Sequence, residues 1–239
     1  MIDDSSINIK IFADGADMDS IISLYKNPLI KGFTTNPTLM RQAGIPDYEV
    51  FGREVLKAVP DRPVSLEVFA DDIDEMIKQG RKISTWGKNV NIKIPITTTK
   101  KESTQKVIQT LSNEGIIVNV TAIMTSEQVS EVARSLNSDV PAIISVFAGR
   151  VADTGRDPIP HMMECLEELS DLEKAELLWA SPREVLNVFQ ADNMGCHIIT
   201  VTEGILKKLS LVNKDLNEYS LETVKMFRDD AVSAGYKIN

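Results

Sequence analysis

Short apolar runs rich in β-branched residues alternate with stretches of helical composition along the whole chain. The apolar runs lie at 9–14, 31–36, 63–70, 89–96, 116–122, 142–148, 175–181 and 196–201. The helical stretches between them include 72–85, 125–136 and 183–191. Eight strand–helix units predict an α/β protein with a single (β/α)8 TIM-type barrel over residues 1–239. A doubly wound open sheet is the alternative, but no glycine-rich phosphate loop follows the first run.

A last helical stretch, at about 220–237, follows the eighth unit. It places Leu221, Val224, Phe227 and Ala231 on one face of a helix. We expect this apolar face to cover the barrel or a neighbouring subunit.

The run 89–96 reads NVNIKIPI and carries a lysine in an apolar setting. Side chains alternate between the two faces of a strand, so the valine and the isoleucines share one face. Asn91, Lys93 and Pro95 share the other face, which points into the interior of a closed barrel. Burying an ammonium group is costly unless it is paired or loses its proton. The position of Lys93 therefore calls for a chemical reason.

Other predicted strands also carry polar residues on the inward face or at their ends. With the lysine, the set is Asp14, Asn36, Glu67, Lys93, Asn119, Thr121 and Ser145. Barrel interiors are dominated by Val, Ile and Leu, and the catalytic groups of such barrels lie at the carboxyl ends of the strands. A hydrogen-bonded network without chemistry is the alternative interpretation.

A lysine beside two carboxylates and a hydroxyl indicates one reaction class. Desolvation lowers a lysine pKa, and a neutral Lys93 amine can condense with a substrate carbonyl to form a Schiff base. The protonated imine withdraws electrons from an adjacent C–C bond, which then breaks in the retro-aldol direction. Asp14 and Glu67, in different surroundings, can move the protons that these steps require, with Thr121 beside them.

Composition excludes several classes of function. The chain has 239 residues and a formal net charge of −9, which disfavours general affinity for nucleic acid or an anionic membrane. An anionic ligand would need a local group of positive side chains. The first ten residues are polar and acidic, and no apolar run is long enough for a transmembrane helix. We expect a soluble cytoplasmic protein.

The cysteines and histidines show no metal-ligand or redox spacing. Cys165 and Cys196 are expected to be reduced thiols, and neither His161 nor His197 has a suitably spaced partner. We therefore expect no metal, and the Schiff-base chemistry expected of Lys93 uses no organic cofactor.

Two polar segments have structural interpretations. The acidic run 164–176 is predicted to be a solvated helix face. The segment 152–158 is predicted to be a loop over the barrel mouth. It is either a lid that orders when phosphate binds or an ordinary turn, as its glycine and proline also allow.

Eight segments together resemble one family, the transaldolases, and specifically the short-chain group close to the fructose-6-phosphate aldolases. The segments are FADGAD (12–17), FTTNPTLM (33–40), VSLEVFA (64–70), NIKIPIT (91–97), NVTAIMTSEQ (119–128), SVFAGRVAD (145–153), ASPR (180–183) and GCHIITV (195–201). They occur in the family's order and span nearly the whole chain.

The resemblance implies roles for individual residues. It makes Lys93 the Schiff-base lysine and Asp14 the proton-transfer group, with Glu67 and Thr121 holding and activating the catalytic water. The implied substrate-binding residues are Asn36, Asn119, Ser145 and Phe147, and the implied phosphate-binding residues are Arg150, Ser181 and Arg183. Two arginines would provide the local positive site that an acidic protein needs for a sugar phosphate.

Two positions separate the branches of the family. The aldolase branch has a glutamine where this chain has Glu67 and a tyrosine where it has Phe147. A glutamate can take up a proton and a glutamine cannot, and a phenylalanine cannot donate the tyrosine's hydrogen bond. The sequence thus favours a transaldolase that moves a dihydroxyacetone unit from fructose 6-phosphate to an aldose phosphate such as erythrose 4-phosphate. An aldolase-like C–C lyase and a non-catalytic sugar-phosphate-binding barrel are the alternatives.

The resemblance also implies partners. Relatives in the short-chain group form ring-like pentamers and decamers in which a C-terminal helix packs on a neighbour. We therefore expect a homo-oligomer with sugar phosphates as its small-molecule partners.

Overall fold

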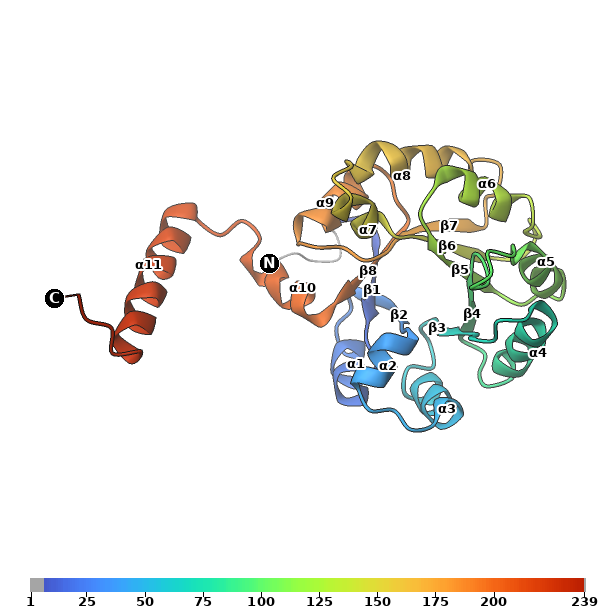
Figure 1. Cartoon of the computed structure of the whole chain (residues 1–239), viewed down its shortest axis with the longest axis horizontal. Helices are drawn as coiled ribbons and strands as arrows, with labels where there is room; N and C mark the ends of the chain where they lie inside the picture. Colours follow the sequence, from blue (N-terminus) through green and yellow to red (C-terminus); the bar gives the residue numbers. More distant parts are fainter. Residues whose placement is uncertain (1–6, 239) are drawn as a thin grey trace.

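The computed structural model describes residues 7–238 and contains a closed barrel of parallel strands in sequence order (Figure 1). The strands are β1 (Lys10–Asp14), β2 (Ile30–Thr34), β3 (Val64–Glu67), β4 (Val90–Pro95), β5 (Val118–Ile123), β6 (Ala142–Val146), β7 (Ala175–Trp179) and β8 (Ile198–Thr202). The predicted (β/α)8 barrel is confirmed, and every predicted strand position holds a strand. The barrel closes through β1, which pairs with both β2 and β8.

Helices surround the barrel and connect successive strands (Figure 1). They are α1 (Met18–Tyr25), α2 (Pro37–Gln42), α3 (Tyr48–Ala58), α4 (Ile73–Ser84), α5 (Gln105–Asn113), α6 (Ser126–Ala133), α7 (Ala148–Asp153), α8 (Pro158–Glu167), α9 (Leu186–Asn193), α10 (Glu203–Lys208), the 3-10 turn η1 (Leu209–Leu211) and α11 (Leu216–Ser233). Most begin at a side-chain cap. Thr125, for example, forms a reciprocal capping box with Gln128 at the start of α6.

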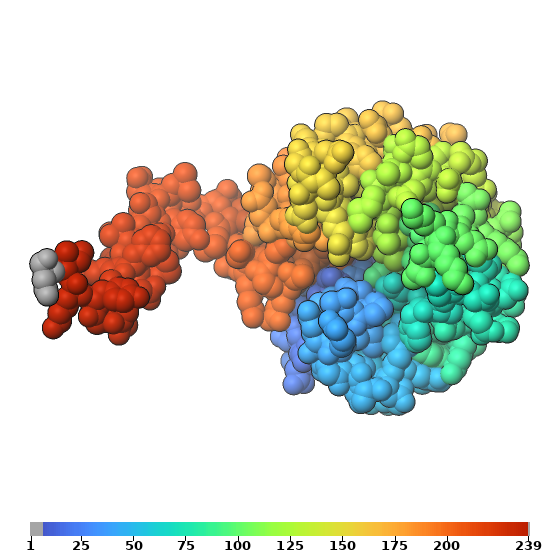
Figure 2. Space-filling model, in the orientation of Figure 1, coloured from blue at the N-terminus to red at the C-terminus, as the bar shows by residue number. Residues whose placement is uncertain are grey.

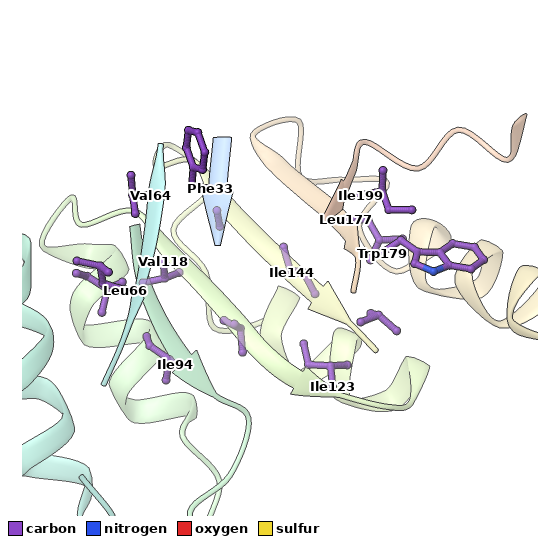
Figure 3. Close-up of a cluster of buried hydrophobic side chains, with 14 of the residues drawn as sticks. Phe33, Val64, Leu66, Ile94, Val118, Ile123, Ile144, Leu177, Trp179 and Ile199 are labelled. Atoms are coloured by element: carbon purple, nitrogen blue, oxygen red, sulfur yellow. The ribbon is translucent and has the colours of Figure 1, made fainter. Parts of the chain in front are cut away.

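The outward faces of the strands form the main core with the helices. The isoleucines of β4 illustrate the arrangement, since Ile92 and Ile94 are fully buried. Ile92 packs toward α4, where a Cβ added to Gly80 would lie 3.4 Å from its Cγ2. Figure 3 shows equivalent side chains, such as Leu66 and Ile144, along the neighbouring strands. The parity predicted for residues 89–96 is therefore correct, and it directs Lys93 inward.

A second, smaller apolar layer lies inside the barrel. It consists of Phe12, Ile143, Leu178, Ala180 and Ile198, with Phe147 packed against it. The Phe12 ring needs a glycine beside it, because a Cβ on Gly32 would lie 2.5 Å from its Cζ. This layer fills the middle of the barrel, below the polar groups at the carboxyl ends of the strands.

Two predicted segments differ from the structure. Residues 152–158 are not one loop, because α7 continues to Asp153 and α8 begins at Pro158. The run 164–176 is helical only up to Glu167, then turns and enters β7. Both errors arise because polar composition does not distinguish an exposed helix end from the turn after it.

The C-terminal helix α11 projects away from the barrel (Figures 1 and 2). It begins at Leu216, earlier than predicted, because Asp215 caps the backbone N–H groups of Asn217 and Glu218. None of its residues is buried, and the side chain of Phe227 in the predicted apolar face is 64% exposed. The helix therefore does not cover its own barrel.

The rest of the chain adds two facts. Residues 1–6, which belong to the polar N-terminal stretch, lie outside the described residues. Across 7–238, no helix combines the length and apolarity needed to cross a membrane.

Candidate active site

A cavity of about 510 Å³ opens at the carboxyl ends of the barrel strands. Most of the residues predicted for the site line it, from seven strand–loop units: Asp14, Asn36, Glu67, Lys93, Thr121, Ser145, Phe147, Arg150 and Ser181. Asn119 and Arg183 are the predicted residues that do not form its wall. The cavity is of the size that binds small ligands, and its position is where barrel enzymes carry their catalytic groups.

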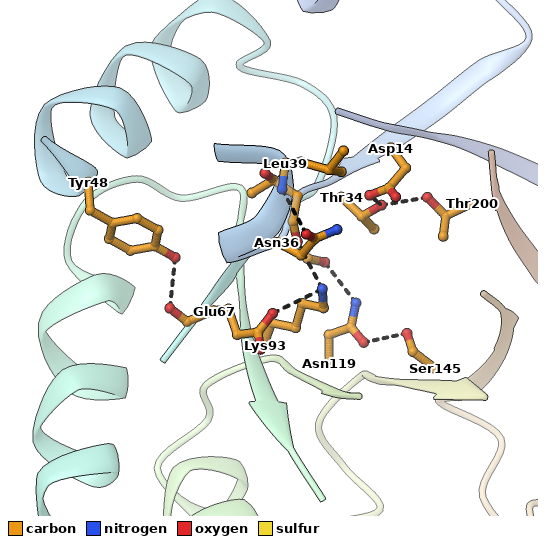
Figure 4. A network of polar contacts seen from close by, with 12 residues as sticks. Asp14, Thr34, Asn36, Leu39, Tyr48, Glu67, Lys93, Asn119, Ser145 and Thr200 are labelled. Atoms are coloured by element: carbon orange, nitrogen blue, oxygen red, sulfur yellow. Dashed lines mark hydrogen bonds and ion pairs between the residues drawn. The ribbon is translucent and has the colours of Figure 1, made fainter. Parts of the chain in front are cut away.

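Lys93 lies on the cavity floor, and its side chain is only 8% exposed. Its Nζ donates to the backbone oxygen of Thr35 at 2.8 Å and lies 3.1 Å from Glu67 Oε2 (Figure 4). The ion pair forms because β3 and β4 are in register, with Glu67 directly beside Lys93. The carboxylate thus compensates a buried ammonium group and lies within proton-transfer distance of it.

Glu67 is itself held from the outside of the barrel. Tyr48, at the start of α3, donates its hydroxyl to the Glu67 backbone oxygen at 2.7 Å (Figure 4). The Tyr48 ring is fixed by edge contacts with Phe69 and Trp86. Burial raises the pKa of Tyr48, so the hydroxyl keeps its proton and remains a donor. Tyr48 therefore anchors the end of β3 at the residue that presents the carboxylate.

Asn119 lies below the cavity wall in a buried network. Its Nδ2 donates to Ser65 Oγ at 2.9 Å, and its Oδ1 accepts from Ser145 Oγ at 2.7 Å. Asn119 therefore supports Ser145, which does reach the cavity, and one of its amide N–H groups remains outside these bonds.

Asp14 at the end of β1 belongs to a separate network (Figure 4). Thr34 Oγ1 donates to Asp14 Oδ1 at 2.8 Å and also contacts Thr200 Oγ1. A hydroxyl has one proton, so Thr200 donates to Thr34 while Thr34 donates to the carboxylate. Desolvation raises the pKa of Asp14, whereas Lys93 and the Thr34 hydrogen bond oppose that rise. Asp14 is consequently a carboxylate tuned toward accepting a proton.

Thr121 is presented by an irregularity in β5. The register against β6 shifts between Val120 and Ile123, and Ala122 in this bulge has φ +62°. Such a conformation is strained for a residue with a Cβ and is found mainly where function requires it. Thr121 Oγ1 is buried and has no hydrogen-bond partner among the described residues. An unsatisfied hydroxyl in a polar cavity is suited to bind a water molecule or a substrate oxygen.

Asn36 caps the short helix α2. Its Oδ1 accepts from the Leu39 backbone N–H at 3.0 Å, so its amide N–H groups remain available toward the cavity. Thr38 and Gln42 of the same helix also line the wall. This side of the cavity offers several hydrogen-bond donors for a polyhydroxylated ligand.

The cavity rim carries the arginines. Arg150 lines the cavity, and its guanidinium lies 5.6 Å from the centre of the Phe147 ring. The rim is tightly built there, since a Cβ on Gly149 would lie 1.6 Å from the Ser181 carbonyl oxygen. Ser181 has φ +61°, which turns the chain after β7 toward α7. Glycine at 149 thus allows two backbone segments to meet and places Arg150 beside Ser181.

The guanidinium of Arg183 already forms hydrogen bonds within the protein. Its Nε donates to Asp153 Oδ1 at 3.0 Å, its Nη2 pairs with Asp153 Oδ2, and its Nη1 donates to Ser181 Oγ at 3.1 Å. Arg183 therefore lies next to Ser181 at the rim, outside the set of residues that line the cavity.

Several residues at the site were not singled out from the sequence, among them Thr34, Thr200, Tyr48 and Asp153. Strand parity could have found the two threonines, because Thr34 and Thr200 occupy inward positions near strand ends. Tyr48 and Asp153 lie on helices and act on partners distant in sequence, so no local pattern marks them.

The cysteines and histidines lie away from the cavity. Cys165 and Cys196 are buried free thiols, and burial raises the pKa of both to about 12. His197 Nδ1 accepts from the Leu177 backbone N–H at 2.9 Å. In the part of the chain that the structure describes, no three His, Cys, Asp or Glu side chains gather closely enough to hold a metal ion.

Comparison with known proteins agrees with the resemblance seen in the sequence. The family described as Transaldolase/Fructose-6-phosphate aldolase matches residues 11–238. A protein of Thermoanaerobacter sp. named "Probable transaldolase" is 33% identical over 231 residues, covering 96% of this chain and 100% of the relative. One of the same name from Methanococcus maripaludis is 36% identical over 202 residues, covering 84% and 89%.

Among solved structures, N-acetylneuraminate lyase from Mycoplasma synoviae is similar, with a TM-score of 0.53 and 11% sequence identity. The match covers 95% of this chain and 83% of that structure and supports the fold alone. The family match spans nearly all of the described chain, including every strand that contributes to the cavity. The chain therefore belongs to the transaldolase/fructose-6-phosphate aldolase family and is a transaldolase-family enzyme.

Proposed function

We propose that the protein is a cytoplasmic class I transaldolase. It transfers a dihydroxyacetone unit from a ketose phosphate such as fructose 6-phosphate to an aldose phosphate such as erythrose 4-phosphate. The observation that carries this proposal is the buried Lys93 ammonium, 3.1 Å from Glu67 on the floor of a polar cavity. A buried ion pair is a costly way to stabilise a fold, whereas a lysine and a base in contact are the reagents for imine formation.

The first half-reaction uses the floor of the cavity. Glu67 takes a proton from Lys93, and the neutral amine attacks the C2 carbonyl of the ketose. Glu67 returns this proton to the carbinolamine hydroxyl, which leaves as water, and the unpartnered Thr121 hydroxyl can hold that water. Asp14 takes the proton of the C4 hydroxyl, the C3–C4 bond breaks, and its electron pair passes into the imine to give an enamine on Lys93. The aldose phosphate then leaves.

The second half-reaction reverses these steps on a new aldehyde. The enamine carbon attacks the acceptor carbonyl, and Asp14 returns its proton to the new hydroxyl. Water adds to the imine and releases the ketose product and the Lys93 amine. Asn36 and Ser145 would hydrogen-bond the sugar hydroxyls, while Arg150 at the rim would bind the phosphate.

The lyase alternative differs in the fate of the enamine, which would be protonated at carbon to an imine that water then hydrolyses, releasing free dihydroxyacetone and the Lys93 amine. Glu67 and Phe147 favour transfer, because these positions differ in the aldolase branch. A coupled assay with fructose 6-phosphate and erythrose 4-phosphate tests this choice. Transfer to the acceptor well above release of free dihydroxyacetone is expected, and the reverse would establish a lyase. Ligand binding without turnover would favour the non-catalytic alternative.

We also propose that α11 packs on another copy of this chain. Its apolar side chains are exposed, with Leu221 at 53% and Val224 at 60%, and such a surface is usually covered in an assembly. Sedimentation velocity should show a homo-oligomer, and removal of residues 214–239 should shift it to monomer. A compact monomer for the full chain would exclude this arrangement.

A further inference from the structure

The rim of the cavity has less free positive charge than its two arginines suggest. Arg150 and Arg183 contribute two charges, and Asp153 of α7 cancels one of them. The Arg183 guanidinium holds the pKa of Asp153 below its ordinary value, with a smaller contribution from Arg150. The carboxylate therefore stays ionised beside both arginines at neutral pH, where a substrate phosphate would approach.

The geometry of the pair leaves part of the guanidinium unused. Of the five N–H groups of Arg183, Asp153 accepts one from Nε and one from Nη2, and Ser181 accepts one from Nη1. One N–H on each terminal nitrogen remains after these bonds. Two adjacent terminal nitrogens can bind two oxygens of one phosphate group in the bidentate manner that arginine favours. The hydroxyl of Ser181, which lines the cavity, marks the side from which a phosphate would approach.

Stability does not explain the Asp153–Arg183 pair. The two side chains are 53% and 45% exposed, and exposed ion pairs contribute little to folding. What the pair does is restrict a long, flexible side chain at the edge of a binding cavity. An arginine that is already fixed loses less conformational entropy when it binds an anion.

We propose that Asp153 is a specificity-determining positioning residue, which anchors Arg183 by its Nε–Nη2 edge so that the remaining N–H groups bind the phosphate of the sugar substrate. This inference rests on the proposed function in taking sugar phosphates as the substrates. Anchoring favours phosphate binding, whereas the negative charge of Asp153 opposes it. We expect the anchoring effect to be the larger one, because two of the three contacts that fix the guanidinium are made to Asp153.

The test compares Asp153→Ala and Asp153→Asn with the wild-type protein. We expect KM for a phosphorylated acceptor to rise about 3- to 10-fold in Asp153→Ala, the effect of losing one pre-ordered side chain, with a much smaller change in kcat. The ratio of kcat/KM for glyceraldehyde 3-phosphate to that for glyceraldehyde should fall by the same factor. Asp153→Asn keeps one acceptor oxygen, so its KM and its kcat/KM ratio should lie between those of the wild-type protein and Asp153→Ala. An unchanged or lower KM in Asp153→Ala would overturn the proposal, because Asp153 would then only compete with phosphate.

A matched control lies elsewhere on the barrel. Arg81 and Glu114 form another exposed, bidentate ion pair, with side chains 52% and 36% exposed. Neither residue lines the cavity. Glu114→Ala should leave the phosphorylated-to-unphosphorylated ratio unchanged. If it lowers the ratio as much as Asp153→Ala does, the effect is general and the proposal fails.

A second measurement separates this proposal from the proposed function. Inorganic phosphate should raise the melting temperature of the Lys93→Met protein, which cannot form a Schiff base, and Asp153→Ala in that background should weaken the phosphate response. That result would support the anchoring role even if the wild-type protein showed no transaldolase activity. An equal phosphate response in both proteins would refute it even if transaldolase activity were established.

Discussion

The floor and the rim of the cavity both hold charged groups, but they hold them differently. On the floor, the side chains of Lys93 and Glu67 are 8% and 17% exposed and come from adjacent strands in register. On the rim, those of Arg183 and Asp153 are 45% and 53% exposed and come from segments after different strands. Desolvated charges interact strongly and are fixed in place, whereas exposed ones are screened by water. The floor is therefore suited to bond chemistry and the rim to selecting the substrate.

The largest expected effect comes from removing the floor lysine. Lys93→Met should lower transaldolase activity by at least about 10⁴-fold, as loss of a covalent nucleophile does. Borohydride with fructose 6-phosphate should add a stable mass to the wild-type protein and none to this variant. Lys10→Met is the control, because Lys10 also pairs with a glutamate, Glu176, but at 51% side-chain exposure outside this cavity. An adduct that persists in Lys93→Met would place the nucleophile elsewhere.

The second effect concerns the other floor carboxylate. Asp14→Asn should reduce kcat by about 10²- to 10⁴-fold, the usual range for a general acid–base group. The borohydride adduct should still form, because Asp14 acts after imine formation in the proposed sequence. Loss of the adduct together with the activity would mean that Asp14 is needed earlier.

The same variant also tests the cost of burying that carboxylate. Burial raises the pKa of Asp14 in the folded protein above 3.8, so folding favours the protonated form. This contribution to stability is present at low pH and is lost as pH rises through the folded-state pKa. Asp14→Asn should therefore melt at a higher temperature than wild type at pH 7, with a gap that narrows as pH falls through the folded-state pKa of Asp14. A lower melting temperature for the variant across this range would show that the ionised group stabilises the fold.

At the rim, the backbone contact at Gly149 is the most sensitive point. Gly149→Ala would place a Cβ 1.6 Å from the Ser181 carbonyl oxygen, so the two segments must separate. We expect a loss of about 1–3 kcal/mol in the free energy of unfolding, measured by urea denaturation, and a raised KM for sugar phosphates. Gly204→Ala is the control, because the nearest atom to its added Cβ lies at 4.0 Å. Equal stability losses in the two variants would show that the rim contact is not special.

The smallest effect tests the hydroxyl pair behind Asp14. Thr34→Val removes a hydrogen bond that lowers the pKa of Asp14, so the acidic limb of the kcat/KM profile should move to higher pH. The expected loss on this acidic limb is about 3- to 10-fold, the value of one hydrogen bond to a charged group. Thr34→Ser retains the hydroxyl and should restore the wild-type profile. If kcat/KM falls by the same factor at every pH, Thr34 only shapes the cavity.

Most of the barrel could be predicted from the sequence, because strand alternation is a local property. Lys93 and Glu67 were placed inside the barrel by parity alone, and the register of β3 against β4 then brought them into contact. Local patterns were less informative for helix ends, as α7 shows, since a polar segment can be either helix or turn. The exposure of α11 could not be predicted from the sequence either, because an amphipathic face does not indicate what it packs against.

The sequence by itself determined the eight-unit periodicity, the inward direction of the polar side chains and the family resemblance. Only the tertiary structure decided which of those side chains meet. Thr34 and Thr200 are 166 positions apart, and Arg183 and Asp153 are 30 apart. The bulge that presents Thr121 likewise depends on pairing between β5 and β6. Side-chain direction within a strand follows from its own backbone, whereas contacts between elements follow from barrel closure and register, which no single segment encodes.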